Sequence, residues 1–107
     1  MNYKINYSSE AYEDINDIYE YIAYELLSPE TAAGKVGRIM DSINKLAFMP
    51  KKHKTNEYEP WRSKGMRTFS ADNFVIFYLV NDADMTVGIV RIIYGGRDIN
   101  TLLDEKT

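Results

Sequence analysis

The sequence predicts an α+β fold of order β-α-α-β-β-β, with an N-terminal helical hairpin packed on a mostly antiparallel sheet. Apolar residues recur every three or four positions across residues 11–47, which is the period of an amphipathic helix. Residues 66–94 instead contain short runs rich in β-branched and aromatic residues, separated by turn residues. Because the chain has 107 residues, we expect a single domain spanning 1–107.

The N-terminal segment predicts a short strand followed by a helix. Tyr3, Ile5 and Tyr7 alternate with polar residues, as in a half-buried strand. Ser8 or Ser9 then offers a helix N-cap. A single apolar stripe defines the first helix, at Ala11, Ile15, Ile18, Ile22 and Leu26.

A second helix is predicted to begin at Ser28-Pro29, where Ser28 caps and Pro29 suits the first helical position. Pro50 ends it. Because the connection is short, the two helices are expected to form an antiparallel hairpin. Gly34 and Gly37 each cost this helix about 1 kcal/mol relative to alanine. We therefore expect them to permit close approach of the two helices.

Three strands are predicted in the C-terminal half, at residues 66–69, 74–80 and 87–94. The turns between them are short, so the strands are antiparallel. The second run is almost entirely apolar, which indicates a central strand. Ile99, Leu102 and Leu103 indicate a final helical turn, and Trp61 is expected to anchor the polar loop 51–65 to the core.

Composition excludes several classes of site. The chain has no cysteine and one histidine, His53, so we expect no disulfide, metal or cofactor. It has no apolar leader and no long uncharged run, which predicts a cytoplasmic protein without a membrane span. The net charge is −3. Basic residues nevertheless gather in one segment, at Lys51, Lys52, Lys54, Arg62, Lys64 and Arg67.

The arginines of the predicted sheet are candidate ligands for an anion. Arg67 and Arg91 lie on adjacent or near-adjacent strands, and Arg97 follows the Gly95-Gly96 pair. A guanidinium group offers bidentate donors to phosphate or carboxylate. For each arginine alone, an ion pair with a nearby acid is the simpler interpretation.

Other residues suit phosphoryl chemistry or a polyanion. Tyr94, at the end of the last strand, is a candidate proton donor. Lys52 and Lys54 are suited to a phosphate backbone. Packing of the tyrosine and solvation of the loop explain these residues equally well. With one histidine, no Ser-His-Asp set is available.

The order and spacing of these segments resemble the RelE/ParE superfamily of type II toxin–antitoxin toxins over nearly the whole chain. The helical part contributes Ala11-x3-Ile15-x2-Ile18, then Pro29-Glu30-Thr31-Ala32. The most specific block is Arg91-Ile92-Ile93-Tyr94-Gly95-Gly96-Arg97-Asp98, in which Tyr94 and Gly96 stand where histidine and a basic residue are more usual. The resemblance implies a growth-arresting toxin that a cognate antitoxin neutralises.

Two activities occur in that superfamily. ParE-like members inhibit DNA gyrase, whereas RelE-like members are metal-independent mRNA interferases that cut mRNA on the translating ribosome. The acidic chain, the long helices and the C-terminal block favour a ParE-like gyrase inhibitor, with Lys52, Lys54 and Arg97 as target- or RNA-binding residues.

The alternative is a RelE-like endoribonuclease. In that case Arg67 and Arg91 stabilise charge, and Tyr94, Lys52 or Lys54 moves protons. A member that has lost toxicity and binds only its partner is a third interpretation.

Overall fold

The computed structural model describes residues 2–95, so the predicted final helical turn lies outside the described residues. The predicted element order is confirmed. The elements are β1 (Lys4–Tyr7), α1 (Ser9–Glu20), the π-helical turn η1 (Tyr21–Glu25), α2 (Pro29–Asn44), the short 3-10 helix η2 (Lys45–Ala47), β2 (Arg67–Ala71), β3 (Phe74–Asn81) and β4 (Thr86–Tyr94).

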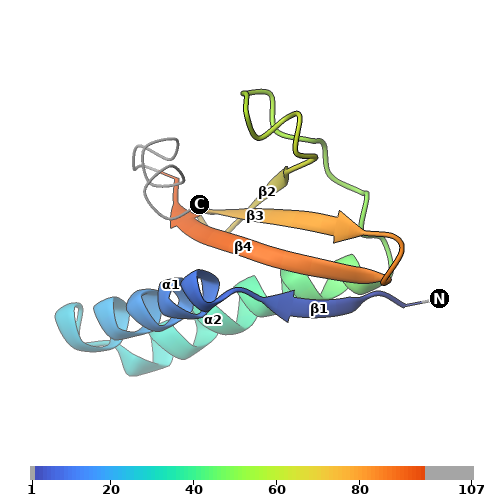
Figure 1. Cartoon of the computed structure of the whole chain (residues 1–107). Helices are drawn as coiled ribbons and strands as arrows, with labels where there is room; N and C mark the ends of the chain where they lie inside the picture. Colours follow the sequence, from blue (N-terminus) through green and yellow to red (C-terminus); the bar gives the residue numbers. More distant parts are fainter. Residues whose placement is uncertain (1, 96–107) are drawn as a thin grey trace.

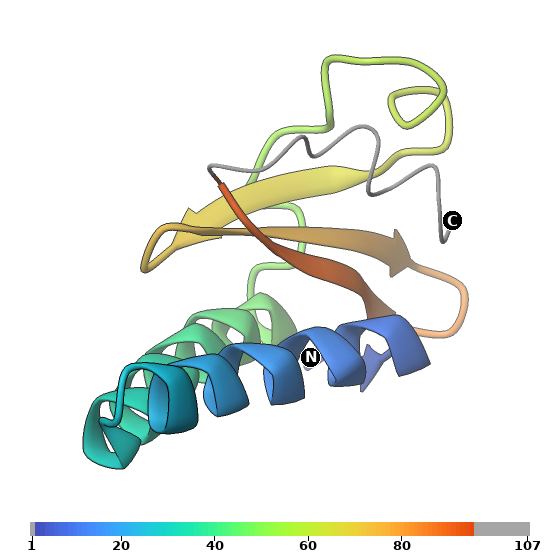
Figure 2. The same ribbon diagram turned by 90° about the vertical axis from the view of Figure 1, so that its left-hand side faces the viewer.

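The four strands form one sheet in the order β1-β4-β3-β2. β2, β3 and β4 are antiparallel neighbours, whereas β1 lies parallel to β4, from Lys4 opposite Thr86 to Tyr7 opposite Ile89. α1 and α2 run side by side below the sheet (Figures 1 and 2). The expectation of a helical hairpin on a mostly antiparallel sheet is therefore confirmed.

The helix N-termini match the predicted signals with one exception. The Ser8 side chain accepts a hydrogen bond from the Ala11 backbone N–H at 3.0 Å and caps α1. Pro29 is the first residue of α2, as expected. The prediction that the Ser28 side chain caps α2 is wrong. Its hydroxyl bonds to the Thr31 hydroxyl at 2.6 Å and makes no cap bond with the backbone.

Hydrophobic clusters cover both faces of the sheet. The larger one packs α1 and α2 against inward side chains such as Ile76 and Tyr78. On the opposite face, Phe77 packs against Trp61, because successive strand residues point to opposite faces. Trp61 is only 4% exposed, which confirms that it anchors the loop before β2.

The expectation that glycines bring the two helices together is wrong for Gly37. Gly37 is exposed, and no atom outside its own helical backbone and chain neighbours lies within 4 Å of the position a Cβ would take. A Cβ at Gly34 would meet only the Arg38 side chain, at 3.3 Å. α2 therefore carries a helix-weakening residue at Gly37 for which its packing gives no reason.

We predict that Gly37→Ala raises the free energy of unfolding by about 0.5–1 kcal/mol, because alanine loses less backbone entropy in a helix. Urea denaturation followed by circular dichroism measures the change. Gly65→Ala is the matched control and should destabilise, because Gly65 has a φ of +77°. A Gly37→Ala variant no more stable than the parent would contradict the packing described here.

Candidate partner-binding groove and basic face

Beyond the end of β1, side chains from the start of α1 and its N-cap bond to the backbone groups on the free edge of β4. β1 pairs with β4 only as far as Ile89. Beyond that point the Ser8 hydroxyl donates to the Val90 carbonyl at 2.8 Å, and the Ile92 N–H donates to Asp14 Oδ2 at 2.9 Å. These bonds satisfy backbone groups that an open edge would leave unpaired.

Asp14 also holds Arg91 in a bidentate ion pair. Arg91 Nε donates to Oδ2 at 2.8 Å, and Nη2 donates to Oδ1 at 3.0 Å. Both residues are buried, Arg91 at 5% and Asp14 at 9% exposure. The structure thus places Arg91 in an internal ion pair between β4 and α1, which matches the simpler interpretation of that arginine.

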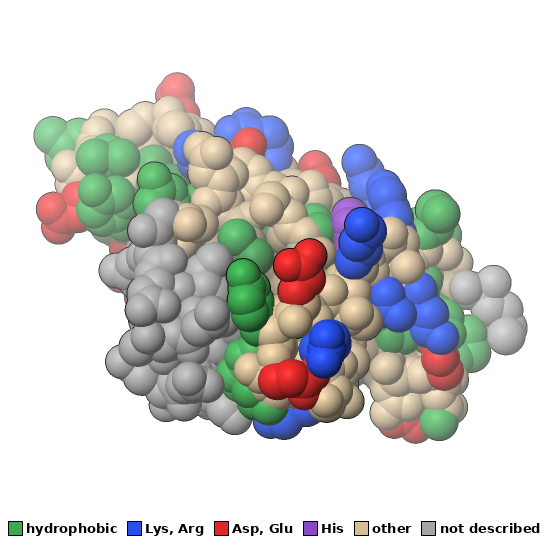
Figure 3. All heavy atoms as spheres, turned by 90° about the horizontal axis from the view of Figure 1, so that it is seen from above, with side chains coloured by type: hydrophobic (Ala, Val, Ile, Leu, Met, Phe, Trp, Pro, Cys, Tyr) green, Lys and Arg blue, Asp and Glu red, His purple; other side chains and the backbone are tan. Residues whose placement is uncertain are grey.

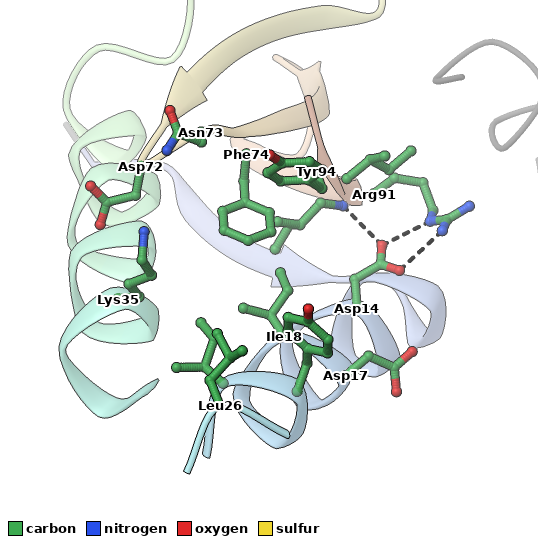
Figure 4. Close-up of a pocket in the computed structure, with 14 residues that line it drawn as sticks. Asp14, Asp17, Ile18, Leu26, Lys35, Asp72, Asn73, Phe74, Arg91 and Tyr94 are labelled. Carbon is green, nitrogen blue, oxygen red and sulfur yellow. Dashed lines mark hydrogen bonds and ion pairs between the residues drawn. The ribbon is translucent and has the colours of Figure 1, made fainter. Parts of the chain in front are cut away.

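A groove of about 720 Å³ opens beside this ion pair, between α1, η1, α2 and the ends of β3 and β4. Figure 4 shows Ile18, Leu26 and Phe74 in the groove, with Lys35 and Asp72 on the α2 side. Tyr94 lines it too, with its ring 5.8 Å from that of Phe74. We call this feature the hairpin groove.

Arg67 lies at the other edge of the sheet, on β2, opposite Tyr78 of β3 in the strand register. Its Nη1 donates to the His53 carbonyl at 2.7 Å and so holds the loop before β2. The His53 ring stacks on Phe69, with centroids 4.5 Å apart. Burial, and then the charge of Lys52, lower the pKa of His53 below its ordinary value.

Lys52 and Lys54 lie on either side of His53 in the chain and are exposed. Neither makes an ion pair or hydrogen bond through its side chain with any residue in the part of the chain that the structure describes. Lys and Arg side chains lie around the histidine in the view from above (Figure 3). We call Lys52, His53, Lys54 and Arg67 the basic face.

The predicted site residues do not converge on one point. Arg67 pairs with Tyr78, whereas Arg91 pairs with Phe77, and β3 separates their strands. Tyr94 pairs with Phe74 of β3. Phe74 and Tyr78 are four residues apart on that strand, which is about 13 Å at the usual strand rise. Arg97 lies outside the described residues. The roles of these residues in binding or catalysis stay predictions.

Asp14 is the residue that the sequence prediction missed. A signal was present, because Asp14 falls three residues after Ala11 and four before Ile18, on the buried stripe of the helix. An acid on that stripe requires a buried partner. Among residues 2–95, no group of three or more His, Asp and Glu side chains is placed to hold a metal ion. No helix there is long and apolar enough to span a membrane.

Residues 5–99 match the family model described as the ParE toxin of the type II toxin–antitoxin system parDE. A search of curated proteins finds no significant match.

Three solved structures share the fold. A chain of the chromosomal ParDE system from P. aeruginosa has a TM-score of 0.70 and 22% identity, covering 86% of this chain and 95% of that one. A chain of the toxin–antitoxin complex RelBE2 from Mycobacterium tuberculosis has a TM-score of 0.60 and 16% identity, covering 88% of this chain and 99% of that one. A mutant of E. coli toxin RelE in the free state has a TM-score of 0.65 and 8% identity, covering 99% of this chain and 94% of that one.

We predict that Asp14→Ala lowers the free energy of unfolding by about 3–5 kcal/mol, as removal of one member of a buried ion pair does. The Ile92 N–H loses its acceptor in the same variant. Chemical denaturation measures the loss. Arg38→Ala, which breaks the exposed pair with Asp72, is the control and should cost less than about 1 kcal/mol. Equal losses in both variants would contradict the role given to Asp14.

We also predict that His53 titrates below its ordinary pKa of 6.5 in the folded chain. The unfolded chain then binds a proton more readily, so this contribution to stability is complete above pH 6.5 and is lost as the pH falls through that value towards the folded pKa. NMR titration of the imidazole measures the shift. In Phe69→Ala, where the stacking partner is gone, the pKa should move back up. An unchanged pKa would exclude burial against Phe69 as the cause.

Proposed function

Because the chain belongs to the ParE toxin family of type II toxin–antitoxin systems, we propose that it inhibits DNA gyrase and is neutralised by a cognate antitoxin. The observation that carries the proposal is the family match over residues 5–99. On this proposal the protein acts by binding and not by catalysis. Lys52, Lys54 and Arg97 are the candidates for contact with the target.

The placement of the arginines supports a binding role. In a metal-independent nuclease, cationic side chains aimed at the scissile phosphate stabilise the charge that develops on it. Here Arg91 is buried against Asp14, and Arg67 holds the His53 carbonyl two strands away. Tyr94 lies in the hairpin groove, away from the basic face to which Arg67 belongs. Together these positions favour the gyrase proposal.

A RelE-like endoribonuclease is the second candidate, and the basic face is the observation that favours it. Lys52 and Lys54 are exposed beside His53, whose lowered pKa keeps its ring neutral near pH 7. Such a group suits proton transfer next to a phosphate backbone. In this mechanism the 2′-hydroxyl of the mRNA attacks the adjacent phosphate.

Parallel assays with the purified toxin separate the two candidates. We predict inhibition of gyrase supercoiling at stoichiometric toxin, and no codon-phased cleavage by primer extension on translating ribosomes. Lys52→Ala with Lys54→Ala should weaken inhibition if the basic face contacts the target, whereas the exposed Lys45→Ala is a matched control. Normal supercoiling together with phased cleavage would establish the nuclease instead. Expression without growth arrest would indicate a member that only binds its partner.

A further inference from the structure

The connection between the two helices projects beyond the sheet, at the left of Figure 1, and carries exposed apolar side chains. Leu27 lies in this connection and is 83% exposed, more than any other large apolar side chain among residues 2–95. Tyr24, on η1, is 69% exposed. Neither residue lines the hairpin groove. We call Tyr24, Glu25, Leu27 and Glu30 the hairpin tip.

The backbone conformation of Leu27 is unfavourable for a leucine. Its φ is +52°, in the left-handed region that bulky residues rarely adopt. The residue lies just past the end of η1, where the Ser28 N–H returns to the Ile22 carbonyl at 3.2 Å. Glycine is the usual residue at this position of a helix C-terminus, because it has no Cβ. The chain therefore carries a leucine where glycine would suit the fold better.

Strain and exposure at the same residue indicate a role in binding. Leu27 holds a disfavoured backbone conformation and leaves its apolar side chain in water. It belongs to none of the hydrophobic clusters in the part of the chain that the structure describes. A residue that breaks local rules without a gain inside the fold is expected at a functional site. The gain is then a contact with another molecule.

The hairpin tip carries charge of one sign. Residues 19–34 contain three charged residues, Glu20, Glu25 and Glu30, and no basic one. All three are exposed, and none makes an ion pair or side-chain hydrogen bond with another residue in the described range. Hydrophobic and acidic side chains lie together at this end of the molecule, at the left of Figure 3. A complementary partner offers an apolar pocket bordered by cations.

We propose that the hairpin tip contacts DNA gyrase, with Leu27 and Tyr24 in an apolar pocket and Glu25 and Glu30 beside basic residues of the enzyme. An enzyme that acts on DNA carries cationic surfaces for the phosphates, so gyrase offers the charge that the tip requires. The inference rests on the proposed function and names a surface of the toxin that binds the target. This surface is separate from the basic face, which borders β2.

A two-fold dimer formed through the hairpin tip is a poorer assignment. Two-fold symmetry brings the same surface of both copies together, so the acids of one tip would face the acids of the other. Like charges placed opposite each other disfavour such a contact.

Leu27→Gly tests the proposal, because it removes the exposed side chain and relieves the backbone. We predict that this variant is at least as stable as the parent in urea denaturation. Its affinity for purified gyrase, measured by surface plasmon resonance, should fall at least about tenfold, as for a hot-spot residue. The concentration that half-inhibits supercoiling should rise in parallel. A purely structural role for Leu27 predicts no loss of affinity in a variant of unchanged stability.

Matched variants separate the hairpin tip from the rest of the surface. Tyr24→Ala should also weaken gyrase binding, whereas Phe48→Ala should not, although both side chains are 69% exposed. Phe48 lies just past η2, at the other end of α2. Glu25→Lys should weaken binding several-fold, and added salt should weaken binding of the parent. Asp41→Lys makes the same change of charge on α2, outside the tip, and should leave binding unchanged.

Parent-like gyrase binding by both Leu27→Gly and Tyr24→Ala would overturn the proposal and leave the proposed function intact. Loss of antitoxin binding with gyrase binding retained would assign the tip to the antitoxin and would also overturn it. So would sedimentation of the free toxin as a dimer that Leu27→Gly dissociates. If the parent neither binds nor inhibits gyrase, the proposed function itself fails, and the assignment of the tip fails with it.

Discussion

The carboxylate of Asp14 is the constraint on which the joining of the two layers depends. It accepts the Ile92 N–H and both bonds from Arg91, so one side chain of α1 takes the place of a neighbouring strand on β4. Without it, the end of β4 would present an open edge next to the buried face of α1. Because the bonds are bidentate and buried, they fix the position of α1 along the sheet. The hairpin groove lies where it does as a result.

This arrangement separates the hairpin groove from the basic face. The sheet order β1-β4-β3-β2 puts the hairpin groove next to β4 and the basic face next to the outer strand β2. Arg91 belongs to the first region as a structural residue, whereas Arg67, Lys52 and Lys54 belong to the second. A ligand in the groove therefore does not have to cover the lysines.

Periodicity was sufficient to predict the element order, the hairpin and the central position of β3, because apolar spacing reports burial directly. It did not predict the parallel pairing of β1 with β4, since a strand of four residues carries no signal for its partner. The candidate site was harder to predict. The sequence places Arg67 and Arg91 on strands of one sheet but does not say how far apart those strands lie. Only the strand pairing shows that β3 separates Arg67 from Arg91. Gly37 was misinterpreted because a glycine in a helix does not reveal whether anything approaches it.

The pairing of β1 with β4 also determines when the fold can be completed during synthesis. Strand β1 has no pairing partner until residues 86–89 have been synthesised. Asp14 likewise has no ion-pair partner until Arg91 has been synthesised. The residues of the helical hairpin are synthesised long before that, so their apolar side chains have no sheet to pack against. Contacts this distant in sequence slow folding. A toxin built this way cannot reach its native form before β4 has been translated.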